Sequence, residues 1–225
     1  MNLLEKDPGR SSHLEQSFLA QRRGMSILAA VFPLVFLASS VLKRTPFQHS
    51  ISDYYWTLEL ERNLLVGILC AIAVFLILYK GYNWLEDRIL DLAGACAAGV
   101  ALVPTAAPGE EGGTLHACFA VTFFACIFYI VIFMSRKSLE ELADPGRAAL
   151  FRRAYRWCAG VMIGSIALAL AGRLLLPRAH FEVLLDFGAV FWFEAIGVWS
   201  FAAFWYLKTR ELDSTVSWVP FRERG

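Results

Sequence analysis

Long runs of apolar residues, almost free of charge, restrict this chain more than any other feature. A helix of roughly 20 residues spans the ~30 Å hydrocarbon core of a bilayer. Six runs of sixteen to twenty-five residues approach that length: Met25–Leu42, Asn63–Tyr79, Ile89–Pro104, Leu115–Met134, Trp157–Leu176 and Val183–Leu207. The sequence therefore predicts an all-α integral membrane bundle of six transmembrane helices.

Composition excludes several other classes of protein. Of the 225 residues, 57% are apolar and 18% are charged, whereas a soluble domain has about 45–50% and about 25%. The five cysteines all fall in apolar runs and form no C-x-x-C pair, so a disulfide framework and a structural zinc cluster are not expected. A net charge of +1 gives no reason to expect nucleic acid as a partner.

The distribution of Lys and Arg predicts the orientation. If the N-terminus is inside, sixteen of the 21 basic residues lie on the inner side, which places both termini in the cytoplasm. The chain then divides into a cytoplasmic segment (1–24), a six-helix membrane domain (25–207) and a cytoplasmic tail (208–225). The first run is read as a retained span because it is longer than the apolar core of a signal peptide.

The most basic inner loop, Ser135–Arg156, has mixed apolar and charged residues. This pattern predicts a short interfacial helix broken at Pro145-Gly146, with arginines that contact anionic lipid headgroups.

Small residues gather in two of the runs. Gly94 lies in a nearly all-small segment of the third run, and Gly160 and Gly164 form a GxxxG pattern in the fifth. Such residues let helix backbones approach closely. They are consistent with close packing inside one bundle, which we favour, or with a homo-oligomer contact.

Charged residues inside a membrane helix require a reason, because burial in hydrocarbon is costly. Asp186 and Arg173 are expected at similar depth and form a predicted ion pair. Glu194 lies near the middle of the sixth run with no basic residue at its depth. It is either a neutral carboxyl hydrogen-bonded to a neighbouring helix, or a group that relays protons or binds a ligand.

A second polar set lies on the predicted outer side. His49, His116 and His180 fall there together with Asp53. Imidazole and carboxylate groups from separate loops are the ligands of divalent metals such as zinc, so these four residues are candidate metal ligands. The alternative for Ser52 and Asp53 is capping of a short helix that leads into the second span.

The motifs of nucleotide-binding and α/β-hydrolase enzymes do not occur. Instead, the segments Ser50–Tyr55, Arg62–Gly67, Asp91–Gly94 and Ala101–Thr105 resemble a family of uncharacterised bacterial multi-pass membrane proteins. That resemblance implies the bacterial cytoplasmic (inner) membrane and assigns no activity.

A more distant similarity is to the alkaline-ceramidase-like superfamily of membrane hydrolases. The resemblance implies a zinc site with a serine, an aspartate and histidines, for which Ser52, Asp53 and His116 are the matching residue types. The superfamily has seven helices and paired histidines in the last, whereas this chain has six runs and Glu194.

Three hypotheses for function result. The first is binding of a lipid or small amphiphile in an outward-facing polar cavity. The second is metal-dependent hydrolysis of a lipid amide or ester, with Asp53 and His116 near the metal. Over all hypotheses the candidate catalytic residues are Asp53 and Glu194. The third is proton-coupled transport through Glu194. The candidate ligand-binding residues are Ser52, Asp53, Tyr54, Arg62, His116, Asp186 and Glu194.

Overall fold

The computed structural model describes residues 8–42, 44–107, 112–140, 142–177, 180, 183–185 and 187–216. Within these ranges the regular structure is entirely helical. Its elements are α1 (Pro8–Val41), the 3-10 helix η1 (Ser52–Trp56), α2 (Glu59–Leu78), α3 (Trp84–Leu102), α4 (Thr114–Tyr129), the π-helix η2 (Ile130–Met134), α5 (Ser135–Glu140), α6 (Pro145–Leu175) and α8 (Ala189–Val216).

Five helical segments are long and apolar enough to cross a membrane. They are Gln16–Val41, Glu59–Leu78, Thr114–Glu140, Pro145–Gly172 and Ala189–Glu211. They correspond to five of the six predicted spans and indicate an integral membrane protein. The remaining predicted span is helical too, but α3 carries Glu86, Asp87, Arg88 and Asp91 in its first eight residues, so its apolar stretch is shorter than in the others.

Local sequence explains where two helices begin. Asn83 caps α3 by accepting the backbone N–H of Glu86 on its side chain at 3.1 Å. Asp144 caps α6 in the same way, with the N–H groups of Gly146 and Arg147. Because Pro145 then occupies the first turn, where its missing N–H is not needed, the predicted break in the basic loop precedes α6 rather than interrupting it.

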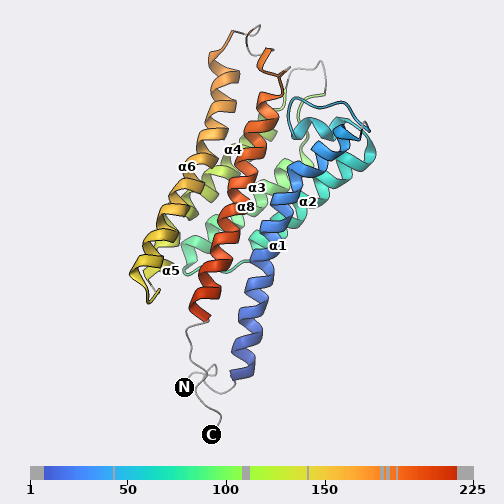
Figure 1. Cartoon of the computed structure of the whole chain (residues 1–225). Coiled ribbons are helices and arrows are strands. Elements are labelled where there is room, and N and C mark those ends of the chain that lie inside the picture. Colours follow the sequence, from blue (N-terminus) through green and yellow to red (C-terminus); the bar gives the residue numbers. More distant parts are fainter. Residues whose placement is uncertain are drawn as a thin grey trace.

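The six long helices form a closed bundle. Each packs against the next along the chain, and α8 returns to pack against α1 (Figure 1). The described ends of α1 and α8 lie at the same end of the bundle, while the α1–α2 connection lies at the other.

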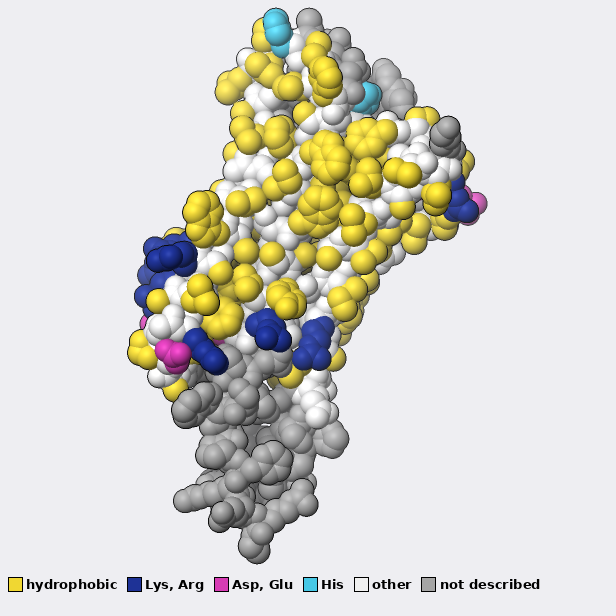
Figure 2. All heavy atoms as spheres, in the orientation of Figure 1, with side chains coloured by type: hydrophobic (Ala, Val, Ile, Leu, Met, Phe, Trp, Pro, Cys, Tyr) yellow, Lys and Arg dark blue, Asp and Glu magenta, His cyan; other side chains and the backbone are white. Residues whose placement is uncertain are grey.

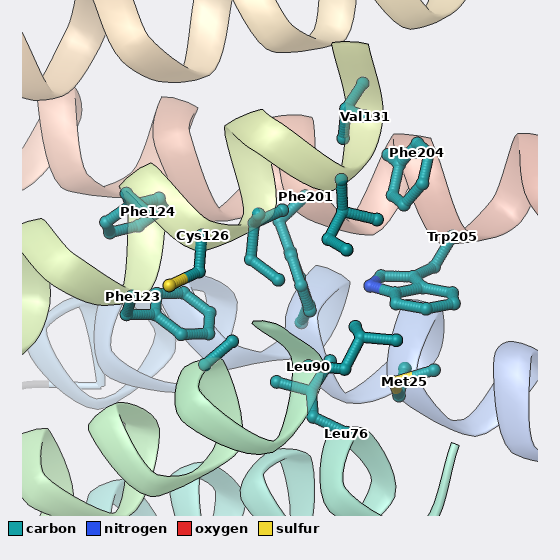
Figure 3. Close-up of a cluster of buried hydrophobic side chains, with 14 of the residues drawn as sticks. Met25, Leu76, Leu90, Phe123, Phe124, Cys126, Val131, Phe201, Phe204 and Trp205 are labelled. Atoms are coloured by element: carbon teal, nitrogen blue, oxygen red, sulfur yellow. The ribbon is translucent and has the colours of Figure 1, made fainter. Parts of the chain in front are cut away.

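An apolar core fills the centre of the bundle. Phe201, Phe204 and Trp205 of α8 face Leu76 of α2 and Leu90 of α3 (Figure 3). Lipid tails are as apolar as these side chains, so close packing and interhelical hydrogen bonds must hold the helices together.

Such hydrogen bonds join α1 to α8. Ser26 donates its hydroxyl hydrogen to the carbonyl of Ala202 at 3.0 Å, and the Trp199 indole donates to the carbonyl of Ala30 at 3.1 Å.

Several helices are longer than the sequence predicts. α1 begins at Pro8 and continues through Pro33, as membrane helices tolerate. α8 begins at Ala189 rather than at 183, and it continues to Val216 beyond the predicted end at Leu207. The start of the predicted cytoplasmic tail is therefore part of the last helix.

The two groups of small residues have different surroundings. A Cβ atom at Gly94 would lie 2.8 Å from the carbonyl oxygen of Ala73 on α2, so this glycine serves close packing inside the bundle. A Cβ atom at Gly160 or Gly164 would meet nothing within 4 Å. The GxxxG pattern of α6 therefore faces outward, and a homo-oligomer contact there stays a prediction.

Surface chemistry follows the axis of the bundle. Most Lys and Arg side chains on the visible face form a band toward the lower end, below a broad apolar surface (Figure 2). Histidine side chains lie at the upper end. This distribution is compatible with a bilayer around the upper and middle parts of the bundle.

Candidate functional site

The α1–α2 loop, residues 44–57, contains most of the predicted site residues. Ser50 and Asp53 bind each other reciprocally at its centre. The Ser50 N–H donates to the Asp53 carboxylate at 3.1 Å, and the Asp53 N–H donates to the Ser50 hydroxyl at 3.1 Å. This is a capping box at the start of η1. The predicted capping role therefore applies to Asp53, which pairs with Ser50, whereas the Ser52 hydroxyl lies beside His116 instead.

Burial raises the pKa of the Asp53 carboxyl above its ordinary value, and the hydrogen bonds from Ser50 and the nearby imidazoles of His49 and His116 oppose that rise.

Two hydrogen bonds tie the loop to α8, and a third ties it to Leu185, which precedes α8. Glu194 accepts the backbone N–H of Ile51 at 2.6 Å on its carboxylate. The Phe191 N–H donates to the carbonyl of His49 at 2.8 Å, and the His49 imidazole donates from Nδ1 to the carbonyl of Leu185 at 2.7 Å. The membrane carboxylate that stood out in the sequence therefore satisfies the free N–H at the start of η1.

Gly188 makes this approach of α8 possible. Its φ of +67° suits glycine, and a Cβ atom there would collide with the ring of Phe47. Phe47 in turn packs edge-on against Phe191, with ring centroids 4.8 Å apart.

Ser52 and His116 form the pair of side chains best suited to catalysis. The Ser52 hydroxyl lies 3.0 Å from His116 Nε2, and His116 Nδ1 lies 2.7 Å from the carbonyl oxygen of Val103. A carbonyl only accepts, so Nδ1 carries the proton, and the lone pair of a neutral imidazole faces Ser52. A hydroxyl, a base and a group that orients the base are the parts of an activated nucleophile.

The pair lies where three elements meet. Ser52 begins η1, His116 is in the first turn of α4, and Val103 is the residue directly after α3. His116 is buried, and Ser52 is half-buried. Nearby, Trp56 of η1 donates its indole N–H to the hydroxyl of Thr105, in the segment after α3, at 3.2 Å.

The other predicted residues do not join this pair. Tyr54 is buried, packs its ring against Phe36 and shares a hydrogen bond with Ser40, so it belongs to the core. Arg62 is exposed and stacks over the ring of Tyr55. His180 is exposed. Asp186 and the side chain of Arg173 lie outside the described residues, so their predicted ion pair stays a prediction.

The metal hypothesis stays untested. In the part of the chain that the structure describes, no three His, Cys, Asp or Glu side chains are grouped to hold a metal ion. Among the candidate ligands, His49 and His116 bind protein groups, and Asp53 is in the capping box.

Sequence reasoning missed a buried carboxyl close to the loop. Glu61, in the first turn of α2, is 2% exposed. One oxygen accepts a hydrogen bond from Ser39, and the other has no hydrogen-bond partner among the described residues. Ser39 also lies 3.3 Å from the hydroxyl of Thr45. The only sequence signal for this site is that Glu61 is a charged residue just before the apolar run Asn63–Tyr79.

A second missed cluster lies at the opposite end of the bundle. Lys208 of α8 is 3% exposed and binds the carboxylate of Glu211 at 3.1 Å. It also donates to the hydroxyl of Ser138 on α5, and Tyr155 of α6 donates to Glu211.

Arg22 of α1 completes this group, which we call the inner cluster because it lies at the predicted inner end of the bundle. Its guanidinium donates to the Tyr79 hydroxyl at 3.1 Å from Nε and to the carbonyl of Lys208 at 2.9 Å. Glu86 of α3 is buried nearby and accepts the backbone N–H of Tyr82 at 2.9 Å. The cluster thus has two cations and two anions from three helices.

Comparison with protein-family models, with curated proteins and with solved structures finds no match to this chain. The two resemblances drawn from the sequence motifs therefore stay predictions, and any function must be argued from the geometry.

Proposed function

We propose that this integral membrane protein is a hydrolase of a lipid ester or amide, with Ser52 as nucleophile and His116 as base. The observation that carries the proposal is the 3.0 Å approach of the Ser52 hydroxyl to His116 Nε2, with Nδ1 held by the Val103 carbonyl. The pair lies at the end of a lipid-embedded bundle, where the ester or amide of a membrane lipid is accessible.

The reaction uses these groups in order. His116 Nε2 takes the hydroxyl proton while Ser52 Oγ bonds to the substrate carbonyl carbon. The protonated imidazole then gives that proton to the departing alcohol or amine, which leaves an acyl-Ser52 ester. Water, deprotonated by the same imidazole, attacks this ester, releases the fatty acid and restores the hydroxyl.

The start of α4 supplies donors for the negative charge that develops on the carbonyl oxygen. Its cap residue is Gly113, which has no side chain to accept the N–H groups of the first turn. His116 lies in that turn, so these N–H groups are adjacent to the base. N–H groups at a helix start favour an oxyanion.

Labelling with a fluorophosphonate probe tests the proposal on the detergent-purified chain. Wild type is expected to react covalently, and Ser52→Ala and His116→Ala are expected to lose the label. Ser200→Ala is the matched control, because the Ser200 hydroxyl donates only to the carbonyl of Ile196. Thermal unfolding shows whether each variant is folded. An unlabelled, folded wild type that releases no fatty acid from phospholipid or ceramide contradicts the proposal.

Binding of a lipid or small amphiphile without chemistry is the second candidate. Phe47, Trp56 and Leu58 expose apolar side chains beside the same loop and are suited to contact acyl chains. A phospholipid that raises the unfolding temperature of a chain that reacts with no probe favours this candidate.

A zinc-dependent reaction is tested by metal analysis of the purified protein. One equivalent of zinc in wild type, lost in His116→Ala, supports it. Proton-coupled transport through Glu194 has the least support, because Phe201, Phe204 and Trp205 fill the core between the two polar clusters.

We further propose that the chain spans a bacterial inner membrane six times and that both termini lie in the cytoplasm. Two of the charged residues of α3 stabilise the turn between α2 and α3: Asp87 accepts the Gly81 N–H at 2.7 Å, and Glu86 accepts the Tyr82 N–H. These charges therefore belong to the end of the span. Gly94 then packs against α2, and Gly99 packs against Phe119 of α4. Reporter fusions at Gly81 and Ala107 are expected on opposite sides of the membrane. The same side for both contradicts a spanning α3.

A further inference from the structure

We propose that α6 carries a binding site for an anionic phospholipid, independent of the Ser52–His116 pair. The site, called the α6 lipid face, consists of Arg152, Arg153, Arg156, Trp157, Gly160 and Gly164. The arginines bind the lipid phosphate, and the two glycines receive an acyl chain.

The positive charge of this face has no acidic neighbour in the described ranges. Arg152, Arg153 and Arg156 are exposed, and no acidic side chain of those ranges lies within ion-pair distance of them. By contrast, Arg147 one turn earlier has Asp144 at 3.7 Å. Dark blue side chains gather at the left edge over the lower part of α6 in Figure 2. Three adjacent guanidinium groups attract an anion and suit the oxygens of a phosphate.

Spacing aligns the charges with an apolar path along the helix. Arg153, Trp157, Gly160 and Gly164 succeed one another at intervals of three or four residues, which places them on one helix face. Trp157 is 69% exposed, as expected for an indole at the level of lipid headgroups. Gly160 lies ~10 Å along the axis from Arg153, so it reaches acyl depth when the arginines meet the phosphate.

The glycines leave open space on this face. A Cβ atom at either Gly160 or Gly164 would meet nothing within 4 Å. The neighbouring side chains of Val161 and Leu168 project, with 41% and 57% of their surface exposed. Open space beside projecting apolar side chains, directly beyond a phosphate site, suits one acyl chain of a phospholipid.

A second copy of this chain fits the same face less well. Helices that pair through GxxxG bring equivalent residues of the two copies together near the crossing. Arg156 lies about one turn before Gly160, and Arg152 and Arg153 lie about two turns before it. A symmetric pair of helices would therefore place six guanidinium groups close to one another. A lipid phosphate neutralises that charge, whereas a second copy doubles it.

Native mass spectrometry of the full chain with phosphatidylglycerol and with phosphatidylcholine tests the site. Wild type is expected to prefer phosphatidylglycerol. The triple variant Arg152→Gln, Arg153→Gln, Arg156→Gln is expected to bind it about a hundredfold more weakly. The matched control is Lys80→Gln, Arg88→Gln, Arg210→Gln, which removes three exposed cations from the same end of the bundle and leaves that affinity nearly unchanged.

One double variant tests the role of the two glycines. Gly160→Leu with Gly164→Leu is expected to lower the affinity for both lipids while the preference for phosphatidylglycerol persists. Equal binding of both lipids by wild type, or an equal loss in the control triple, overturns the proposal. So does a dimer that dissociates in the glycine variant and strengthens in the arginine variant, since a second copy would then occupy the face.

Discussion

The two polar clusters of this bundle differ in how they are built. At the predicted outer end, Glu194, His49 and His116 form the outer cluster and bind mainly backbone groups of a loop or a helix end. At the inner end, Lys208 and Glu211 bind each other and the side chains of other helices.

The two clusters are therefore suited to different roles. The inner cluster joins α1, α5, α6 and α8 through buried charges that are expensive to separate. The outer cluster holds a loop over the bundle and leaves one hydroxyl beside one imidazole. Stability is therefore expected to depend more on the inner cluster, and chemistry on the outer one.

Lys208→Met is expected to have the largest effect on stability. It leaves the Glu211 carboxylate buried without its cation, which typically costs about 3–5 kcal/mol. Thermal unfolding in detergent measures the loss, with the exposed Arg210→Met as control. Adding Glu211→Leu should restore much of the stability. A loss no greater than that of the control would remove the distinction between the clusters.

His116→Ala is expected to cost less, about 1–3 kcal/mol, because it leaves the Val103 carbonyl and the Ser52 hydroxyl without their partner. His180→Ala is the matched control, since that side chain is exposed. The same unfolding assay compares them. A larger loss than that of Lys208→Met would reverse the ranking.

Glu194→Gln is expected to cost about 1 kcal/mol, since the amide oxygen still accepts the Ile51 N–H but without a charge. Glu194→Leu removes the acceptor and should cost more. Both unfolding and probe labelling are measured. If Glu194→Gln leaves both unchanged, the charge of this carboxylate has no role.

Asp53→Asn is expected to have the smallest effect, within about 1 kcal/mol, because the amide keeps an acceptor for the Ser50 N–H. In wild type the pKa of the Asp53 carboxyl is raised, so the folded chain holds the carboxyl proton more tightly than the unfolded chain does. The resulting stabilisation is present below the ordinary pKa of aspartate and is lost as pH rises through the folded value. Unfolding from pH 4 to 8 should show this loss in wild type and not in the variant.

The outer cluster was largely predictable because its residues are conspicuous in the sequence. Ser52 and Asp53 are adjacent in a polar loop, and Glu194 is a carboxylate in an apolar run. The sequence did not reveal that His116 meets Ser52, because that contact depends on how α3 and α4 end beside the loop. Similarly, it did not point to Ser50, which pairs with Asp53 in the capping box.

The inner cluster escaped prediction for a different reason. Arg22 and Lys208 looked like the cationic flanks that hold a helix end in the cytoplasm. Their burial depends on α1 packing beside α8, although the two residues are 186 positions apart. Long-range neighbours of this kind leave no mark in hydrophobic periodicity. The five apolar spans, by contrast, are predictable from length and composition alone.

The π-helical turn η2 sets the rotational phase of α5, the helix directly after it. A π turn accommodates one residue more than an α turn, and the Ser135 backbone N–H donates to the carbonyl of Ile130, five positions earlier. Deleting one residue there would let the chain revert to ordinary winding and swing α5 around its axis by about 100°. Ser138 would then face away from Lys208, so this single inserted residue keeps α5 and α8 in register within the inner cluster.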